Sequence, residues 1–217
     1  MKHMLSYRSR LLVALAALLL VPAFFLPIWT ISLEAPQYPE GIGMEIMVNT
    51  IRGESEWDLQ NINGLNHYIG MKEIHPDSIR ELDIMPWLLG GLVVFGLLAA
   101  ALGRKRLLQV WLGAFIILAI AGLVDFYMWG HDYGHNLNPD AAIKVPGMAY
   151  QPPVIGSKQL LNFTAHSWPG IGGLLAFASM ALGIAALWLD RARAPSPNAL
   201  QTAPGASASA RVGHARA

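Results

Sequence analysis

Long runs of hydrophobic residues, separated by more polar segments, set the organisation of this chain. Each run has about the twenty apolar residues that an α-helix needs to cross a hydrocarbon core about 30 Å thick. Only residues 103–106 separate the second run from the third, so these two are expected to form a tight helical hairpin. The hydrophobic pattern predicts four transmembrane helices, at residues 11–31, 84–102, 107–129 and 168–189.

Basic residues next to the hydrophobic runs determine the expected orientation in the membrane. They lie in the N-terminal segment 1–10, in the 103–106 turn and in the segment 190–217 after the last run. Short cytoplasmic segments of membrane proteins are enriched in Lys and Arg, so all three segments are predicted to be cytoplasmic. The connections 32–83 and 130–167 then face the periplasm of a bacterial inner-membrane protein, and the first of them is rich in acidic residues.

The composition agrees with membrane insertion and excludes several kinds of site. Hydrophobic residues make up 54% of the 217 residues and charged residues only 13%, which is too apolar for a water-soluble domain of this size. The chain has no cysteine, which excludes disulfides, thiol chemistry and thiolate metal ligands. It has no basic stripe with interleaved aromatic residues, so nucleic-acid binding has no support.

The two periplasmic connections are expected to fold together. Residues 41–53 are β-branched and partly alternating, which predicts a strand, and residues 57–62 are a candidate partner strand. Residues 65–74 have helical spacing, and the second connection is rich in proline and glycine, which is typical of an irregular loop. The predicted fold class is a membrane all-α protein, a four-transmembrane-helix bundle with a small α+β periplasmic cap and a disordered tail at 190–217.

Histidine and methionine side chains in the first connection are candidate metal ligands. His67 and Met71 are four residues apart and would share one face of a helix, with His75 four residues further on. Nitrogen and thioether ligands suit copper, above all Cu(I), where thiolates are lacking. Gly70 weakens such a helix, however. The alternative is that His67 is a hydrogen-bonded loop residue and Met71 a packing residue.

A second candidate group follows the third hydrophobic run. His131 and His135 are four residues apart, and Asp132 between them could orient an imidazole ring. Gly134 argues against a regular helix here, and the alternative interpretation is that the histidines cap helix carbonyls and contact lipid headgroups. His166 precedes the fourth run, returns to the same side of the membrane and is predicted to complete a site with either group.

One acidic residue, Asp125, lies inside a predicted span. Intramembrane carboxylates are costly and tend to have a function, which keeps an ion or solute transporter among the alternatives. Asp125 lies about one turn from the outer boundary, where its side chain can reach water. The sequence contains no nucleophile elbow, zincin, P-loop or dinucleotide-binding motif, so the chain is predicted not to be an enzyme.

Two segments of the periplasmic connections carry a family resemblance: INGLNHYIGMKEI and HDYGHNLNPDAAIKVPGMAYQPPVIGSKQLLNF. They resemble segments of uncharacterised small bacterial membrane proteins associated with copper-enzyme maturation, in particular the accessory proteins of nitrous oxide reductase systems. The resemblance implies a partner in periplasmic copper handling, and the matching segments contain His67, Met71, His131 and His135. The accessory lipoproteins of such systems have a lipidated cysteine, which this chain lacks, so it is not simply one of them.

The sequence thus predicts an inner-membrane accessory protein that holds or delivers copper on the periplasmic side. Its expected partner is a periplasmic copper enzyme or a copper chaperone. Two alternatives stay open: a non-catalytic structural or assembly subunit, in an oligomer or a larger membrane complex, and a small ion or solute transporter. The predicted metal ligands are His67, Met71, His131, His135 and His166.

Overall fold

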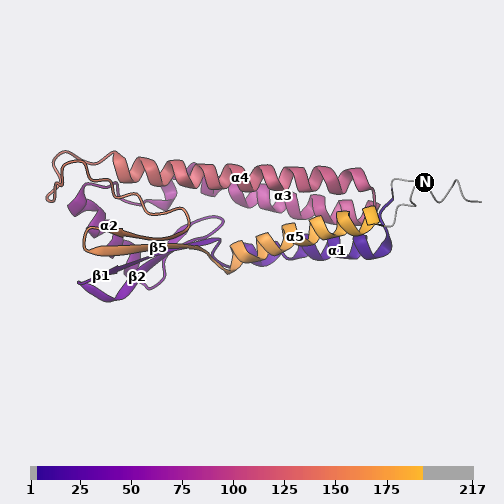
Figure 1. Cartoon of the computed structure of the whole chain (residues 1–217), viewed down its shortest axis with the longest axis horizontal. Coiled ribbons are helices and arrows are strands. Elements are labelled where there is room, and N and C mark those ends of the chain that lie inside the picture. The colour runs from indigo at the N-terminus through magenta and orange to yellow at the C-terminus, as the bar shows by residue number, and fades with distance from the viewer. Residues whose placement is uncertain (1–3, 193–217) are drawn as a thin grey trace, which may run out of the picture.

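The computed structural model describes residues 4–192. In this part of the chain, four long helices form a bundle, and a five-stranded sheet with a short helix lies at one end of it (Figure 1). The elements are α1 (Tyr7–Leu18), η1 (Val21–Phe24), β1 (Trp29–Ala35), β2 (Tyr38–Ile46), β3 (Ile51–Gly53), α2 (Asp58–Ile69), η2 (Pro76–Ser78), α3 (Arg80–Leu102), α4 (Lys105–His135), β4 (Gly156–Leu160), β5 (Phe163–Pro169) and α5 (Ile171–Ala192).

Four helical segments of the described chain are long and apolar enough to cross a membrane. The first joins α1 to η1, and the other three correspond to α3, α4 and α5. Helix α1 packs against α3 and α5, and α4 packs against the same two helices, which closes the bundle. The bounds of the four segments are Tyr7–Phe24, Arg80–Leu102, Lys105–His135 and Ile171–Asp190.

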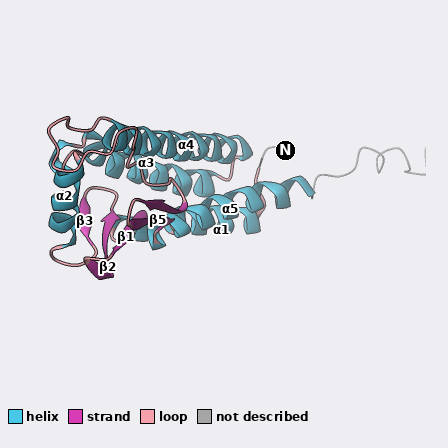
Figure 2. Cartoon of the chain, turned by 60° about the vertical axis from the view of Figure 1, so that its left-hand side comes forward, coloured by secondary structure: helices cyan, strands magenta, loops and turns pink. Residues whose placement is uncertain are grey.

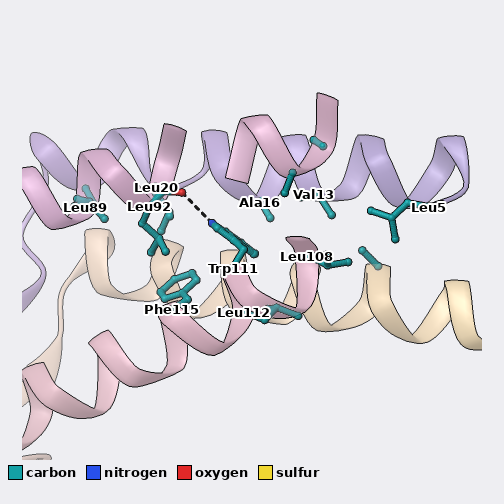
Figure 3. Close-up of a cluster of buried hydrophobic side chains, with 14 of the residues drawn as sticks. Leu5, Val13, Ala16, Leu20, Leu89, Leu92, Leu108, Trp111, Leu112 and Phe115 are labelled. Carbon is teal, nitrogen blue, oxygen red and sulfur yellow. Dashed lines mark hydrogen bonds between the residues drawn. The ribbon is translucent and has the colours of Figure 1, made fainter. Parts of the chain in front are cut away.

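The core of the bundle is built around Trp111 of α4 (Figure 3). Its side chain has no exposed surface, and its indole N–H donates to the carbonyl oxygen of Leu92 in α3 at 2.9 Å. The ring fits because α3 and α5 have glycine where they meet it: a Cβ at Gly96 or Gly183 would come within 2.8 or 2.7 Å of the ring. Small residues are typical of helix contacts in membranes, where close packing provides much of the attraction.

Polar contacts close the end of the bundle that lies away from the sheet. Gly103 has a φ of 63° and ends α3, so the chain can turn directly into α4. Arg10 of α1 donates to two carbonyl oxygens in the last turn of α3, at 2.8 and 2.6 Å. A positive charge is favourable at a helix C-terminus. Lys105 and Asp190 form an ion pair at 3.5 Å, which links α4 to α5.

The sheet is antiparallel throughout and has the strand order β3-β2-β1-β5-β4. Its first three strands come from the segment before α3 and the other two from the segment after α4, so the β1–β5 pair joins the two connections into one structure. Gly170 donates its N–H to the carbonyl oxygen of Ile28 at 3.0 Å, just beyond this pair. The sheet therefore continues directly into two of the bundle helices.

Helix α2 lies against β2 and β3 (Figure 2). Its first residue, Asp58, is buried, and its Oδ2 accepts the N–H of Gly43 at 3.0 Å and that of Ser55 at 3.1 Å. Asn63 bonds through both side-chain atoms to the backbone of Ile74, at 2.7 and 3.1 Å, and holds the segment that follows α2. We refer to residues 29–79 and 136–169 as the cap.

The first and the last membrane helix are shorter than predicted at the ends nearest the cap. The first helical segment stops at Phe24, and residues 29–31, predicted as part of a span, begin β1. At the other end of the sequence, Trp168 lies in β5 and α5 begins at Ile171. The reason is that strands buried inside the cap are as apolar as a membrane helix, so composition alone extends both predicted spans.

Three further predictions differ from the structure. Residues 57–62, predicted as a strand, belong mostly to α2, and residues 156–167 of the predicted irregular loop lie in the β4–β5 hairpin. Helix α4 continues to His135, past the predicted boundary at residue 129. The disordered tail predicted for 190–217 lies outside the described residues from 193 onward, while its first residues belong to α5.

Candidate functional site

Helix α4 is longer than one membrane crossing. Its 31 residues extend about 46 Å, whereas a hydrocarbon core is about 30 Å thick. The last turns of α4 therefore run alongside the cap, as Figure 1 shows. Three of the ring side chains on these turns are exposed, and each is one turn from the next: Tyr127, His131 and His135.

His131 and His135 form a stacked pair. Their ring centroids are 4.0 Å apart and their planes differ by 13°. The Nδ1 atom of His135 lies 3.0 Å from the carbonyl oxygen of His131, so we assign the proton to Nδ1 and the free lone pair to Nε2. A bond of this kind, from the second ring nitrogen to a carbonyl, is what orients metal-binding histidines in general. The pair thus places two exposed imidazoles side by side on one helix face. The lone pairs of nearly parallel rings do not point at one atom, so at least one ring must turn before both can bind the same ion.

Asp132 faces the cap and not the histidine pair. Its Oδ2 accepts a bond from Nζ of Lys72 at 2.5 Å, and its Oδ1 accepts one from the side chain of Asn136. Among the described residues it has no hydrogen bond to either imidazole, in contrast to the role expected from the sequence. The Lys72–Asp132 bond instead ties α4 to the segment that follows α2, beside the ring of Tyr133.

The structure separates His67 from Met71. Gly70 has a φ of 81° and ends α2, so the helix that would align the two side chains does not reach Met71. His67 is exposed and lines an open groove on the outside of α2, together with His75. Met71 is half-buried and lines an apolar cavity inside the cap. The prediction that these two residues share a face is wrong, because it assumed an uninterrupted helix.

His75 and His166 have polar neighbours of their own. The Nε2 atom of His75 lies 3.1 Å from Oε2 of Glu73. In the sheet, Nδ1 of His166 lies 2.6 Å from Oγ of Ser157, its direct partner on β4. The other ring nitrogen of His166 is buried and lies 3.6 Å from Oε1 of Glu34, which is beyond hydrogen-bonding distance.

The five predicted ligands therefore do not converge. Within residues 4–192, no group of three or more His, Cys, Asp or Glu side chains is arranged to hold a metal ion. The structure brings His131 and His135 together and places His67, Met71 and His166 elsewhere. Two imidazoles suit copper or zinc, and the remaining coordination positions would be open to water or to ligands from another molecule.

Tyr150 is a buried residue with a polar group that the sequence patterns do not single out. It is 2% exposed, and its hydroxyl has no hydrogen-bond partner among the residues that the structure describes. Its backbone N–H bonds to the carbonyl oxygen of Gly134 at 2.9 Å, so it is held against α4. The only signal in the sequence is an aromatic residue beside the prolines of the segment 150–154, which is not specific.

Comparison with known proteins does not assign the chain to a family. No protein-family model matches the sequence, and no curated protein is significantly similar to it. The resemblance of the two cap segments to copper-enzyme accessory proteins therefore stays a prediction.

Proposed function

We propose that this chain is a non-catalytic membrane protein that holds a copper ion at His131 and His135 and passes it to a periplasmic partner. The observation that carries the proposal is the proximity of two exposed imidazoles on α4, which rotation about the side-chain bonds can turn toward one ion, with Nδ1 of His135 bonded to a backbone carbonyl. Both rings are exposed, so an ion held there is accessible to a second protein. The resemblance of the cap segments supports copper as the ion and a copper enzyme as the recipient.

A site with two protein ligands suits transfer better than storage. A structural metal site usually has its coordination positions closed by the protein, whereas an open site exchanges ligands with its surroundings. Here the protein supplies two neighbouring imidazoles on a rigid helix, and a partner's ligands can take the open positions. Helix α4 sets the spacing of the two residues, and the Lys72–Asp132 bond ties its last turns to the cap.

Copper binding tests the proposal directly. We expect the purified protein to bind about one Cu(II) per chain. His131→Ala or His135→Ala should weaken copper binding at least tenfold, since losing even a residue that only hydrogen-bonds to a metal ligand typically lowers metal affinity 10- to 100-fold. Equilibrium dialysis followed by metal analysis measures the affinity, and electron paramagnetic resonance reports nitrogen coordination. His67→Ala is the matched control, because it removes another exposed imidazole of the cap. Equal affinity in the double variant H131A/H135A would contradict the proposal.

The orientation in the membrane is a separate prediction. Basic segments next to the spans predict that the cap is periplasmic and that the start of α1 is cytoplasmic. Because the chain has no cysteine, single cysteines can be introduced at the exposed positions Ser55, in the cap, and Met4, before α1. An impermeant maleimide should label Ser55→Cys in intact cells and Met4→Cys only after permeabilisation. The reverse pattern would place the histidine pair on the cytoplasmic side and exclude a periplasmic recipient.

A further inference from the structure

His166 and Glu34 lie next to each other on the outer face of the sheet. The direct partner of His166 on β1 is Ser32, and Glu34 lies two residues further along the same strand. Side chains two residues apart in a strand point to the same face, so His166 and Glu34 are diagonal neighbours across the β1–β5 pair. The residues that precede them in the chain, Leu33 and Ala165, line the cavity on the inner face. The His166–Glu34 pair therefore faces away from α2 and α4.

One ring nitrogen of His166 is held in place, and the other has no partner. Nδ1 lies 2.6 Å from the hydroxyl oxygen of Ser157, the direct partner of His166 on β4. Nε2 is buried and has no hydrogen-bond partner among residues 4–192, and Oε1 of Glu34 lies 3.6 Å from it. The hydrogen bond to Ser157 thus fixes the imidazole ring with its unpartnered nitrogen beside the carboxylate of Glu34.

No protonation state of the imidazole satisfies Nε2 in this arrangement. If only Nδ1 carries a proton and donates it to Ser157, the lone pair of Nε2 lies beside a carboxylate, and two acceptors face each other. If Nε2 carries a proton, in the neutral or the charged ring, the distance of 3.6 Å to Glu34 is too long for a hydrogen bond. A buried polar atom without a partner calls for an explanation. A metal ion between Nε2 and Glu34 provides one, because it accepts the lone pair and neutralises the carboxylate.

The separation of the two atoms fits a zinc ion. Bonds from zinc to nitrogen and oxygen are about 2.0–2.2 Å long, so an ion bonded to two atoms 3.6 Å apart has an angle of about 120° between those bonds, close to tetrahedral. Histidine and glutamate are both usual zinc ligands, and a hydrogen bond at the second ring nitrogen commonly orients such a histidine. The Glu34 side chain is 72% exposed, so its carboxylate can adjust to the ion, and water can take the remaining coordination positions.

From this geometry we infer that His166 and Glu34 bind a zinc ion on the outer face of the sheet, with Ser157 as the residue that positions the imidazole. Strand β1 belongs to the first connection and β5 to the second, so the ion links the two connections that build the cap. This site is separate from the histidine pair on α4 and does not depend on the proposed copper binding.

Zinc titration of the full chain in detergent micelles, measured by isothermal titration calorimetry, tests the inference. The H131A/H135A double variant serves as the background, because it lacks the proposed copper ligands and any zinc that it binds must be held elsewhere. We expect this double variant to bind one Zn²⁺ per chain. In the same background, His166→Ala should abolish zinc binding, and Glu34→Gln should weaken it at least tenfold.

Two further variants separate a specific site from a general effect of charge or of folding. Ser157→Ala keeps both ligands and changes only an exposed hydroxyl, and it should weaken zinc binding about tenfold, as expected for loss of an orienting partner. Glu56→Gln is the matched control with unchanged affinity, because this exposed glutamate lines the groove outside α2. Zinc should also slow hydrogen exchange at residues 32–34 and 164–166. Absence of zinc binding in the double variant, or equal affinity after His166→Ala or Glu34→Gln, would overturn the inference.

Discussion

Replacing Trp111 by alanine is expected to lower the free energy of unfolding by about 3–5 kcal/mol, the usual cost of truncating a buried tryptophan. The indole has no exposed surface and lies edge-to-face against Phe115, with ring centroids 5.6 Å apart. Its neighbours on α3 and α5 are Gly96 and Gly183, which have no side chain that could move into the space. The substitution would therefore leave a cavity in the middle of the bundle and remove the bond to Leu92.

The measurement is reversible unfolding in mixed detergent micelles, followed by circular dichroism. Trp188→Ala is the matched control, because this tryptophan of α5 is 66% exposed and should change stability by less than about 0.5 kcal/mol. Trp111→Phe keeps much of the ring and should lose less than half as much as the alanine variant. If Trp111→Ala unfolded at the same detergent composition as Trp188→Ala, the bundle core would not be organised around Trp111.

Much of the bundle follows from the sequence because membrane helices are long, continuous and apolar. The hairpin of α3 and α4 is an example, since Gly103 interrupts an apolar run and basic residues follow it at once. The cap is harder to predict because its central strand pair, β1 with β5, joins residues that lie far apart in the chain. Pairing over such a distance leaves no local periodicity, and the apolar strand residues 29–31 have the composition of the helix before them.

In the candidate site too, contacts between residues on one helix can be predicted from the sequence, and contacts between distant segments cannot. The i, i+4 spacing of His131 and His135 correctly predicts that the two rings lie together, because both are on one helix. The same spacing fails for His67 and Met71, since Gly70 adopts a left-handed conformation and ends α2 between them. No spacing rule could place Tyr150, because its burial depends on the packing of the second connection against α4.

Gly134 in the sequence argues against a regular helix at the histidine pair, but in the structure this glycine has a different role. A Cβ at position 134 would lie 2.4 Å from the backbone nitrogen of Gln151 and 2.5 Å from its Cα. Glycine is thus required for the segment 150–154 to approach α4, while α4 itself continues to His135. The contact positions Tyr150 and closes one side of the cavity in the cap.

Gly134→Ala should therefore displace the segment 150–154 and cost at least about 2 kcal/mol, because overpacking costs about 1–3 kcal/mol and the buried N–H of Tyr150 loses its partner. Hydrogen exchange should increase at residues 148–154. Gly122→Ala is the matched control on the same helix, since a Cβ there meets nothing within 4 Å. Copper affinity should stay within about twofold in both variants, because alanine favours the helix that aligns His131 and His135. Unchanged exchange at residues 148–154 in Gly134→Ala would show that the second connection is not held to α4 by this contact.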